Sequence, residues 1–150
     1  MDALLVLALG VNLWDIEPAR AALGGDEASV ISDAAAVHGA VQTKPLQQYA
    51  IQEVTGDGGM RIREFLNRDG TVFAVTWSGP VVPDLRRLLG TNFSIYTAAL
   101  AGVPQRGLHR SLRITASGLI VETGGHMRAY IGRAYLPALV PVGTSTAELR

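Results

Sequence analysis

The sequence predicts a single α+β domain: one antiparallel sheet of two three-strand meanders, a long amphipathic helix packed on one face, and a short N-terminal helix. Two observations predict this class. Short runs rich in β-branched and aromatic residues alternate with glycine-containing turns, which is the pattern of β-hairpins. Between two groups of such runs, large apolar residues recur at the three-and-four spacing of one helical face.

Three strands are expected on each side of the long helix. The breaks in the first group are Gly56–Gly59 and Asn67–Gly70, and those in the second are Ala116–Gly118 and Gly124–Gly125. These breaks are short enough to make antiparallel hairpins. The expected strands are Tyr49–Val54, Met60–Leu66, Thr71–Trp77, Arg110–Thr115, Leu119–Thr123 and Met127–Tyr135.

The third of these strands is apolar on both sides. Its bulky side is expected to carry Phe73, Val75 and Trp77, and its small side Val72 and Ala74. A strand without a polar face is expected at the centre of a sheet or beneath a helix.

The long helix is expected to begin at Pro83 and Asp84, because proline suits the first turn and an acidic residue there meets the positive end of the helix dipole. It should end near Ala101, with a possible break at Gly90. Its apolar face comprises Leu85, Leu88, Leu89, Phe93, Tyr96 and Leu100. The remaining expectations are a short helix over Asp26–Gly39, a connection over Val41–Leu46 and a final turn over Thr146–Arg150.

Composition excludes several classes of function. The 150 residues fit one domain, and 48% hydrophobic residues supply a core. Thirteen basic residues balance thirteen acidic ones, so no nucleic-acid partner is expected. The absence of cysteine removes disulfides and thiolate sites. No phosphate-loop motif is present, and the three histidines lie in separate segments, so neither a cofactor nor a metal is expected.

The N-terminus has the features of an export signal. Ala3–Leu13 is an apolar run too short to span a bilayer, and Ala19–Ala21 offers a small-x-small cleavage site. We expect residues 1–21 to be a signal peptide and 22–150 to be a periplasmic or secreted domain without a transmembrane segment. The alternative is an N-terminal helix packed on the domain. Met1–Asp2 supplies no positive charge, which an assigned start downstream of the true one would explain.

Arginine gives the clearest binding pattern, because twelve of the thirteen basic residues are arginine and only Lys44 is lysine. Guanidinium groups recognise carboxylates and phosphates through paired N–H donors. A row of arginines on one sheet face would bind an anionic ligand or an envelope protein, although a half-solvated sheet also needs polar outer residues. The arginines expected on strands are Arg61, Arg63, Arg113, Arg128 and Arg133.

Catalytic candidates are weaker. His126 follows two glycines, where backbone N–H groups can line an anion pocket, and Ser78 ends a strand. A hydrolase would use His126 with Ser78 or a carboxylate, for example in a triad of Ser78, His126 and Asp84, but the nucleophile-elbow motif is absent. A hairpin turn and a strand end explain these residues more simply. Glu53 and Glu64 can form either an acid–base dyad or, as we favour, an ion pair of Glu53 with Arg61 or Arg63.

Three ordered groups of segments resemble a family of short exported bacterial proteins, domain of unknown function 2844. They are Ala22–Asp26; Val72–Pro80 with Pro83–Arg86 and Leu88–Gly90; and Gly124–Ala129 with Gly132–Pro137. The resemblance implies export and assigns no activity or catalytic residue. We therefore expect a cofactor-free binding or accessory module of the envelope. The alternatives are the small exported hydrolase and a self-associating structural component.

Overall fold

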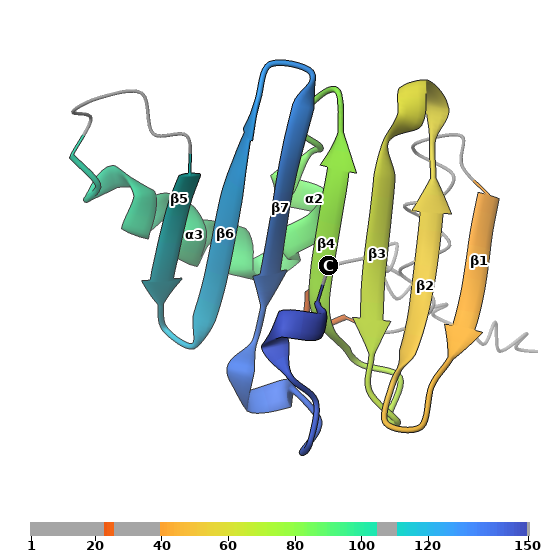
Figure 1. Cartoon of the computed structure of the whole chain (residues 1–150). Helices are drawn as coiled ribbons and strands as arrows, with labels where there is room; N and C mark the ends of the chain where they lie inside the picture. The colour runs from red at the N-terminus through yellow and green to blue at the C-terminus, as the bar shows by residue number, and fades with distance from the viewer. Residues whose placement is uncertain (1–22, 26–39, 105–110, 150) are drawn as a thin grey trace, which may run out of the picture.

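Seven strands form one antiparallel sheet, in the order β1-β2-β3-β4-β7-β6-β5 (Figure 1). This computed structural model describes residues 23–25, 40–104 and 111–149, without the side chain of Asp57. The expected signal peptide, the expected helix over Asp26–Gly39, His38 and His109 lie outside the described residues. The strands are β1 (Ala40–Pro45), β2 (Ala50–Thr55), β3 (Arg61–Leu66), β4 (Val72–Gly79), β5 (Ser111–Ala116), β6 (Leu119–His126) and β7 (Ala129–Tyr135).

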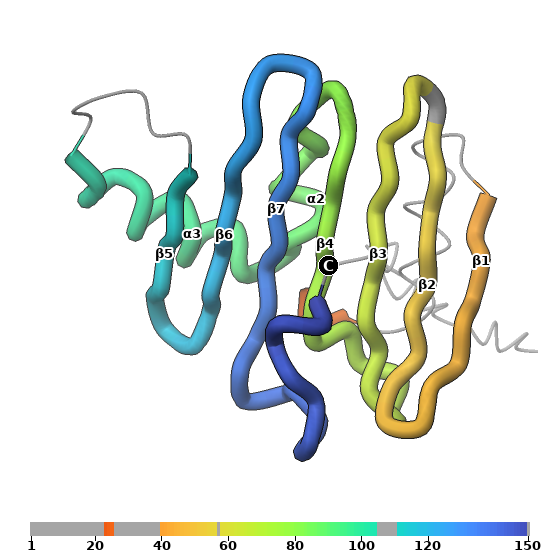
Figure 2. The backbone as a smooth tube through the Cα atoms, viewed as in Figure 1, coloured from red at the N-terminus to blue at the C-terminus, as the bar shows by residue number. Residues whose placement is uncertain are grey.

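The sheet joins two meanders through β4 and β7. Strand β4 pairs with β7 in antiparallel orientation, which places β4 at the centre of the seven strands as its two apolar sides predict (Figure 2). The single antiparallel sheet is confirmed. The expected connection over Val41–Leu46 is wrong, because Ala40–Pro45 pairs with β2 and makes the first meander four-stranded. All six residues of β1 are exposed, so this strand has no apolar alternation to reveal it.

A register shift in β4 overturns the expected faces of that strand. Val75 and Trp77 share one side as expected, and that side faces the helices, but Phe73 belongs to the core cluster on the opposite face. The pairing of β3 with β4 slips between Phe65 and Leu66, which face Ala74 and Val72 respectively. The extra residue, Phe73, falls in this bulge, and the alternation of sides is reset there.

One face of the sheet is covered by a helical segment that contains α2 (Leu85–Leu89), the 3-10 turn η2 (Gly90–Asn92) and α3 (Phe93–Ala101). The Asp84 side chain caps α2 by accepting hydrogen bonds from the N–H groups of Arg86 and Arg87. Gly90 has φ 52°, and the long helix is interrupted there. The expected apolar face is confirmed: Leu88, Leu89 and Tyr96 are buried, and Leu85, Phe93 and Leu100 pack against them.

The opposite face, which we call the second face, is partly covered by the chain after β7 (Figure 1). This C-terminal segment contains η3 (Pro137–Leu139) and η4 (Thr146–Glu148), the latter in the expected final turn. Leu149 is only 1% exposed and packs with Phe65, Phe73 and Tyr135. The phenol of Tyr49 makes a hydrogen bond with Glu148, and burial together with that carboxylate raises the pKa of Tyr49.

Residues 23–25 contact the helix-side core and the start of β4. Leu23 is 1% exposed and packs in the helix-side core, and its N–H donates to the Leu88 carbonyl. Val72 exchanges hydrogen bonds with the backbone of Gly24 and Gly25, so this short stretch is held beside the start of β4.

Within the described residues, no helix combines the length and apolarity needed to cross a bilayer.

Candidate functional site

A continuous row of polar residues crosses the second face of the sheet. Each member is the register partner of the next, so the row runs perpendicular to the strands through the whole sheet. From β1 to β5 it comprises Gln42, Glu53, Arg63, Thr76, Arg133, Glu122 and Arg113. Neighbouring side chains in such a row project to the same face and lie close enough to interact.

The first charged cluster is centred on Glu53 of β2. Arg63 donates its Nε–H to Glu53 Oε2 over 2.5 Å, and Arg61 Nε lies 3.4 Å from Oε1. This confirms the expected cross-strand ion pairs. Glu64 does not form a dyad with Glu53, because its register partner is Gln52 and its buried side chain lies on the helix face.

The second cluster is centred on Glu122 of β6, which accepts hydrogen bonds from arginines on both neighbouring strands. Arg113 Nη1 lies 2.6 Å from Oε1, and Arg133 donates its Nε–H to Oε2. Arg133 also donates through Nη1 to the Thr146 carbonyl over 2.7 Å, and its guanidinium lies 5.7 Å from the Tyr135 ring centroid. Arg133 thus fastens the C-terminal segment to the sheet.

Within the described residues, four arginines on one face therefore contact the carboxylates of Glu53 and Glu122. The side chains of Arg63 and Arg133 are 32% and 28% exposed, whereas those of Arg61 and Arg113 are 52% and 58% exposed. The first pair is held within the sheet, and the second pair faces solvent. We call this surface the arginine face: Arg61, Arg63, Arg113 and Arg133, with Glu53 and Glu122.

A hollow of about 420 Å³ lies beside the second cluster. Thr76, Ser111, Ile131 and Leu149 line it together with Glu122 and Arg133. Hydroxyl groups next to a guanidinium can bind an anion or a sugar oxygen. Sequence reasoning missed Thr76 and Ser111, because their nearness to Arg133 depends on the pairing of β4 with β7 and of β6 with both its neighbours.

Arg128 lies apart from the arginine face. It occupies the turn between β6 and β7 with φ 65°, and its side chain is exposed. The structure thus brings four of the five expected arginines together on one face and places the fifth at the tip of a hairpin.

The structure does not bring the catalytic candidates together. His126 ends β6, is exposed, and has Nδ1 3.2 Å from the Met127 carbonyl oxygen. Ser78 lies on β4, and β7 runs between β4 and β6, which separates the two strands by about 10 Å. The Asp84 carboxylate is engaged in capping α2. Within the described residues, no group of three or more His, Asp or Glu side chains has the arrangement of a metal site.

Comparison with known proteins gives a family and no activity. The comparisons with curated proteins and with solved structures found no match. The model of one family, described as "Protein of unknown function (DUF2844)", matches residues 19–149, which is most of the chain. The chain therefore belongs to the DUF2844 family, as the three groups of segments noted in the sequence predict.

Proposed function

We propose that this chain is an exported, cofactor-free binding module of the bacterial envelope, and that it holds an anionic ligand on its arginine face. The observation that carries the proposal is the gathering of four arginines around two glutamates on one face of the sheet. The glutamates hold the guanidinium groups in place and reduce their mutual repulsion, while the exposed guanidinium groups of Arg61 and Arg113 favour an anion.

The spacing of the two clusters favours an extended ligand. Arg61 and Arg63 lie on β3, whereas Arg113 lies on β5, which is four strand spacings away. At about 4.8 Å per spacing, the clusters are roughly 19 Å apart. A single phosphate or carboxylate reaches one cluster only, while an extended chain with repeated acidic groups reaches both. We therefore infer that the ligand is a polyanion such as an acidic polysaccharide.

The test is the binding of alginate oligomers, a polyuronate, to residues 22–150, measured by isothermal titration calorimetry with dextran oligomers as the neutral control. The double variant Arg61→Gln/Arg113→Gln removes the two solvent-facing guanidinium groups. If each contributes about 0.5–1 kcal/mol, affinity falls about fivefold to thirtyfold. Binding should also weaken as salt rises from low to physiological concentration.

Arg86→Gln is the matched control, because Arg86 is an exposed arginine on α2, in the helix layer, with its guanidinium 4.9 Å from the Phe93 ring centroid. This variant loses the same charge and should bind alginate within twofold of the unmodified protein. An equal loss of alginate affinity in Arg86→Gln and in the double variant would show that net charge, and not the arginine face, causes the binding. Equal binding of dextran and alginate would overturn the proposed ligand class.

Export is a separate part of the proposal and rests on the apolar run and cleavage site at the N-terminus. Protein recovered from the periplasm or the medium should begin near Ala22 when its N-terminus is sequenced. An intact Met1 in that fraction would contradict the signal peptide.

Self-association is a second candidate, favoured by the exposure of the edge strand β1 along its full length. No other described strand pairs with its outer edge. Lys44 and Pro45 oppose such pairing, because a charge and a missing N–H both disfavour strand addition. Light scattering of residues 22–150 at increasing concentration tests this candidate: a constant monomer mass would reject it, and a dimer abolished by Val41→Pro would support it.

A further inference from the structure

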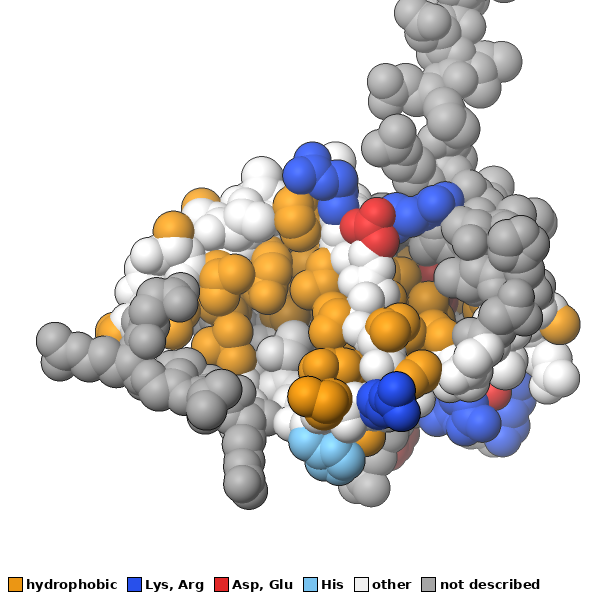
Figure 3. Space-filling view, turned by 90° about the horizontal axis from the view of Figure 1, so that it is seen from above, with side chains coloured by type: hydrophobic (Ala, Val, Ile, Leu, Met, Phe, Trp, Pro, Cys, Tyr) orange, Lys and Arg blue, Asp and Glu red, His pale blue; other side chains and the backbone are white. Residues whose placement is uncertain are grey.

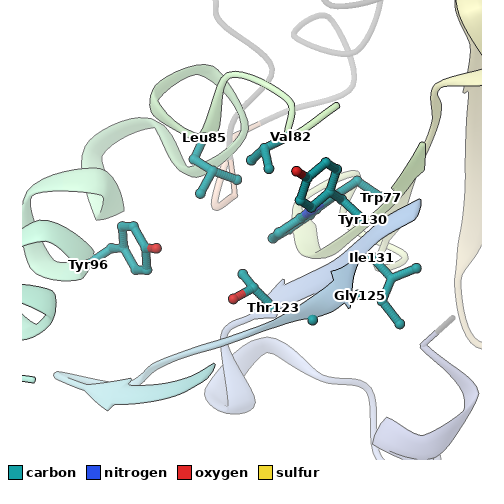
Figure 4. Close-up of a pocket in the computed structure, with 9 residues that line it drawn as sticks. Trp77, Val82, Leu85, Tyr96, Thr123, Gly125, Tyr130 and Ile131 are labelled. Atoms are coloured by element: carbon teal, nitrogen blue, oxygen red, sulfur yellow. The ribbon is translucent and has the colours of Figure 1, made fainter. Parts of the chain in front are cut away.

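A second cavity lies on the helix side of the sheet, away from the arginine face. It has a volume of about 300 Å³ and is bounded by the β4–α2 connection, α3 and the β6–β7 hairpin (Figure 4). Figure 3 shows apolar side chains gathered around the hollow at this end of the molecule. The lining includes Trp77, Leu85, Tyr96, Thr123 and Tyr130.

The polar groups of this lining include the Trp77 indole N–H and the hydroxyls of Tyr96 and Thr123. Trp77 and Tyr96 are only 3% and 8% exposed. Within the described part of the chain, neither the Trp77 indole N–H, the Tyr96 hydroxyl nor the Thr123 hydroxyl makes a hydrogen bond. Figure 4 shows the hydroxyls of Tyr96 and Thr123 directed into the space between the helices and the strands. A ligand in the cavity can accept hydrogen bonds from such donors.

The position of Trp77 is set by its neighbour on β7. A Cβ atom added to Gly132 would lie 2.2 Å from a carbon of the indole ring, so the ring packs directly on the glycine backbone. Only glycine permits this approach. The indole is therefore a rigid wall of the cavity.

The chemistry of the lining defines the ligand. None of the nine described residues that line it is charged, so none of them compensates the desolvation of an ionic ligand. Aromatic and aliphatic walls favour an apolar face, and burial raises the pKa of Tyr96, which keeps its hydroxyl protonated as a donor. A volume of about ten liquid water molecules suits a molecule of one ring.

We propose that this cavity, which we call the aromatic cavity, binds a neutral, single-ring molecule that presents an apolar face and an oxygen acceptor to Tyr96 and Thr123. The cavity is on the opposite side of the sheet from the arginine face. The proposal about the aromatic cavity therefore does not depend on anion binding at the arginine face.

The test uses three probes of similar shape with residues 22–150: acetophenone, which has an acceptor oxygen; isopropylbenzene, which has none; and benzoate, which is charged. Trp77 is the only tryptophan in this part of the chain, since the other is Trp14. Its indole N–H cross-peak in a nitrogen–proton NMR spectrum reports directly on the cavity. Acetophenone should shift this peak saturably, and its affinity should be higher than that of either other probe.

Four variants sharpen the test. Tyr96→Phe and Thr123→Val should each weaken acetophenone binding about twofold to twelvefold, the range that corresponds to one hydrogen bond. Tyr49→Phe removes a hydroxyl from the second face and is the matched control, with no expected change. Val82→Trp places a bulky side chain at the exposed rim and should block binding without disturbing the core, since Val82 is 52% exposed.

The proposal is overturned by any of three results. Equal or tighter binding of isopropylbenzene would show that the hydroxyls play no part. Tighter binding of benzoate would contradict the neutral ligand. An unshifted Trp77 peak at millimolar acetophenone, with a folded spectrum, would show that the cavity does not admit a ring.

Discussion

Replacing Leu149 by alanine tests whether the C-terminal segment is part of the core. Leu149 is 1% exposed and contacts the aromatic cluster of the second face. The change removes three carbon atoms, which at about 0.8 kcal/mol each accounts for about 2.4 kcal/mol of lost transfer free energy. The cavity left behind adds to this, so the expected loss in the free energy of unfolding is about 2–5 kcal/mol.

Val142→Ala is the matched control, because Val142 lies in the same segment and is 95% exposed. Its effect should stay within about 0.5 kcal/mol. Both variants would be measured by equilibrium unfolding in urea, followed by Trp77 fluorescence. Equal stability of Leu149→Ala and Val142→Ala would refute the burial of this segment against the sheet.

Three further predictions concern stability. Trp77→Ala should cost about 3–5 kcal/mol in urea unfolding, because its side chain is in the core, and an unchanged melting temperature would refute its burial. Asp84→Ala should lower stability by about 0.5–2 kcal/mol through loss of the α2 cap; in thermal melts followed by circular dichroism, the exposed-turn variant Asp69→Ala should change less. Burial raises the pKa of Tyr96 above its ordinary value of 10.0. The stability that the protonated phenol contributes is therefore fully present below pH 10 and is lost as pH rises through the folded-state pKa. Unfolding measured from pH 9 to 12 should show a shallower decline in Tyr96→Phe, and an identical decline would contradict this assignment.

The parts of the fold that the sequence predicts are those with a local cause. Alternating apolar residues and glycine turns mark β2, β3 and the three strands after the helix. Pro83 and Asp84 mark the start of the helical segment, and the spacing of its leucines marks the buried face. These features depend on residues close together in the sequence, so the amino-acid sequence alone is enough to predict them.

The parts that the sequence conceals depend on distant contacts. Strand β1 carries no apolar alternation and is held by pairing with β2. Phe73 changes face because of a bulge against β3, which nothing within its own strand indicates. Leu149 follows two prolines and a glycine, and its burial becomes evident only when the C-terminal segment is placed over the second face.

The candidate site shows the same division. Alternation along each strand correctly places Arg61, Arg63 and Arg113 on the polar sides of their strands. The partnership of Arg133 with Glu122 and the nearness of Thr76 require the order of β4, β7 and β6 in the sheet. The aromatic cavity depends on the packing of helices against that sheet, and no sequence motif marks it.

The most direct test of the anion-binding account is an NMR titration of the arginine Nε–H groups of residues 22–150 with alginate oligomers. The account predicts saturable shifts at Arg61, Arg63, Arg113 and Arg133, with the Arg86 signal unmoved. Shifts confined to Arg86 and the other helix-side arginines, or no shift at low salt, would contradict it.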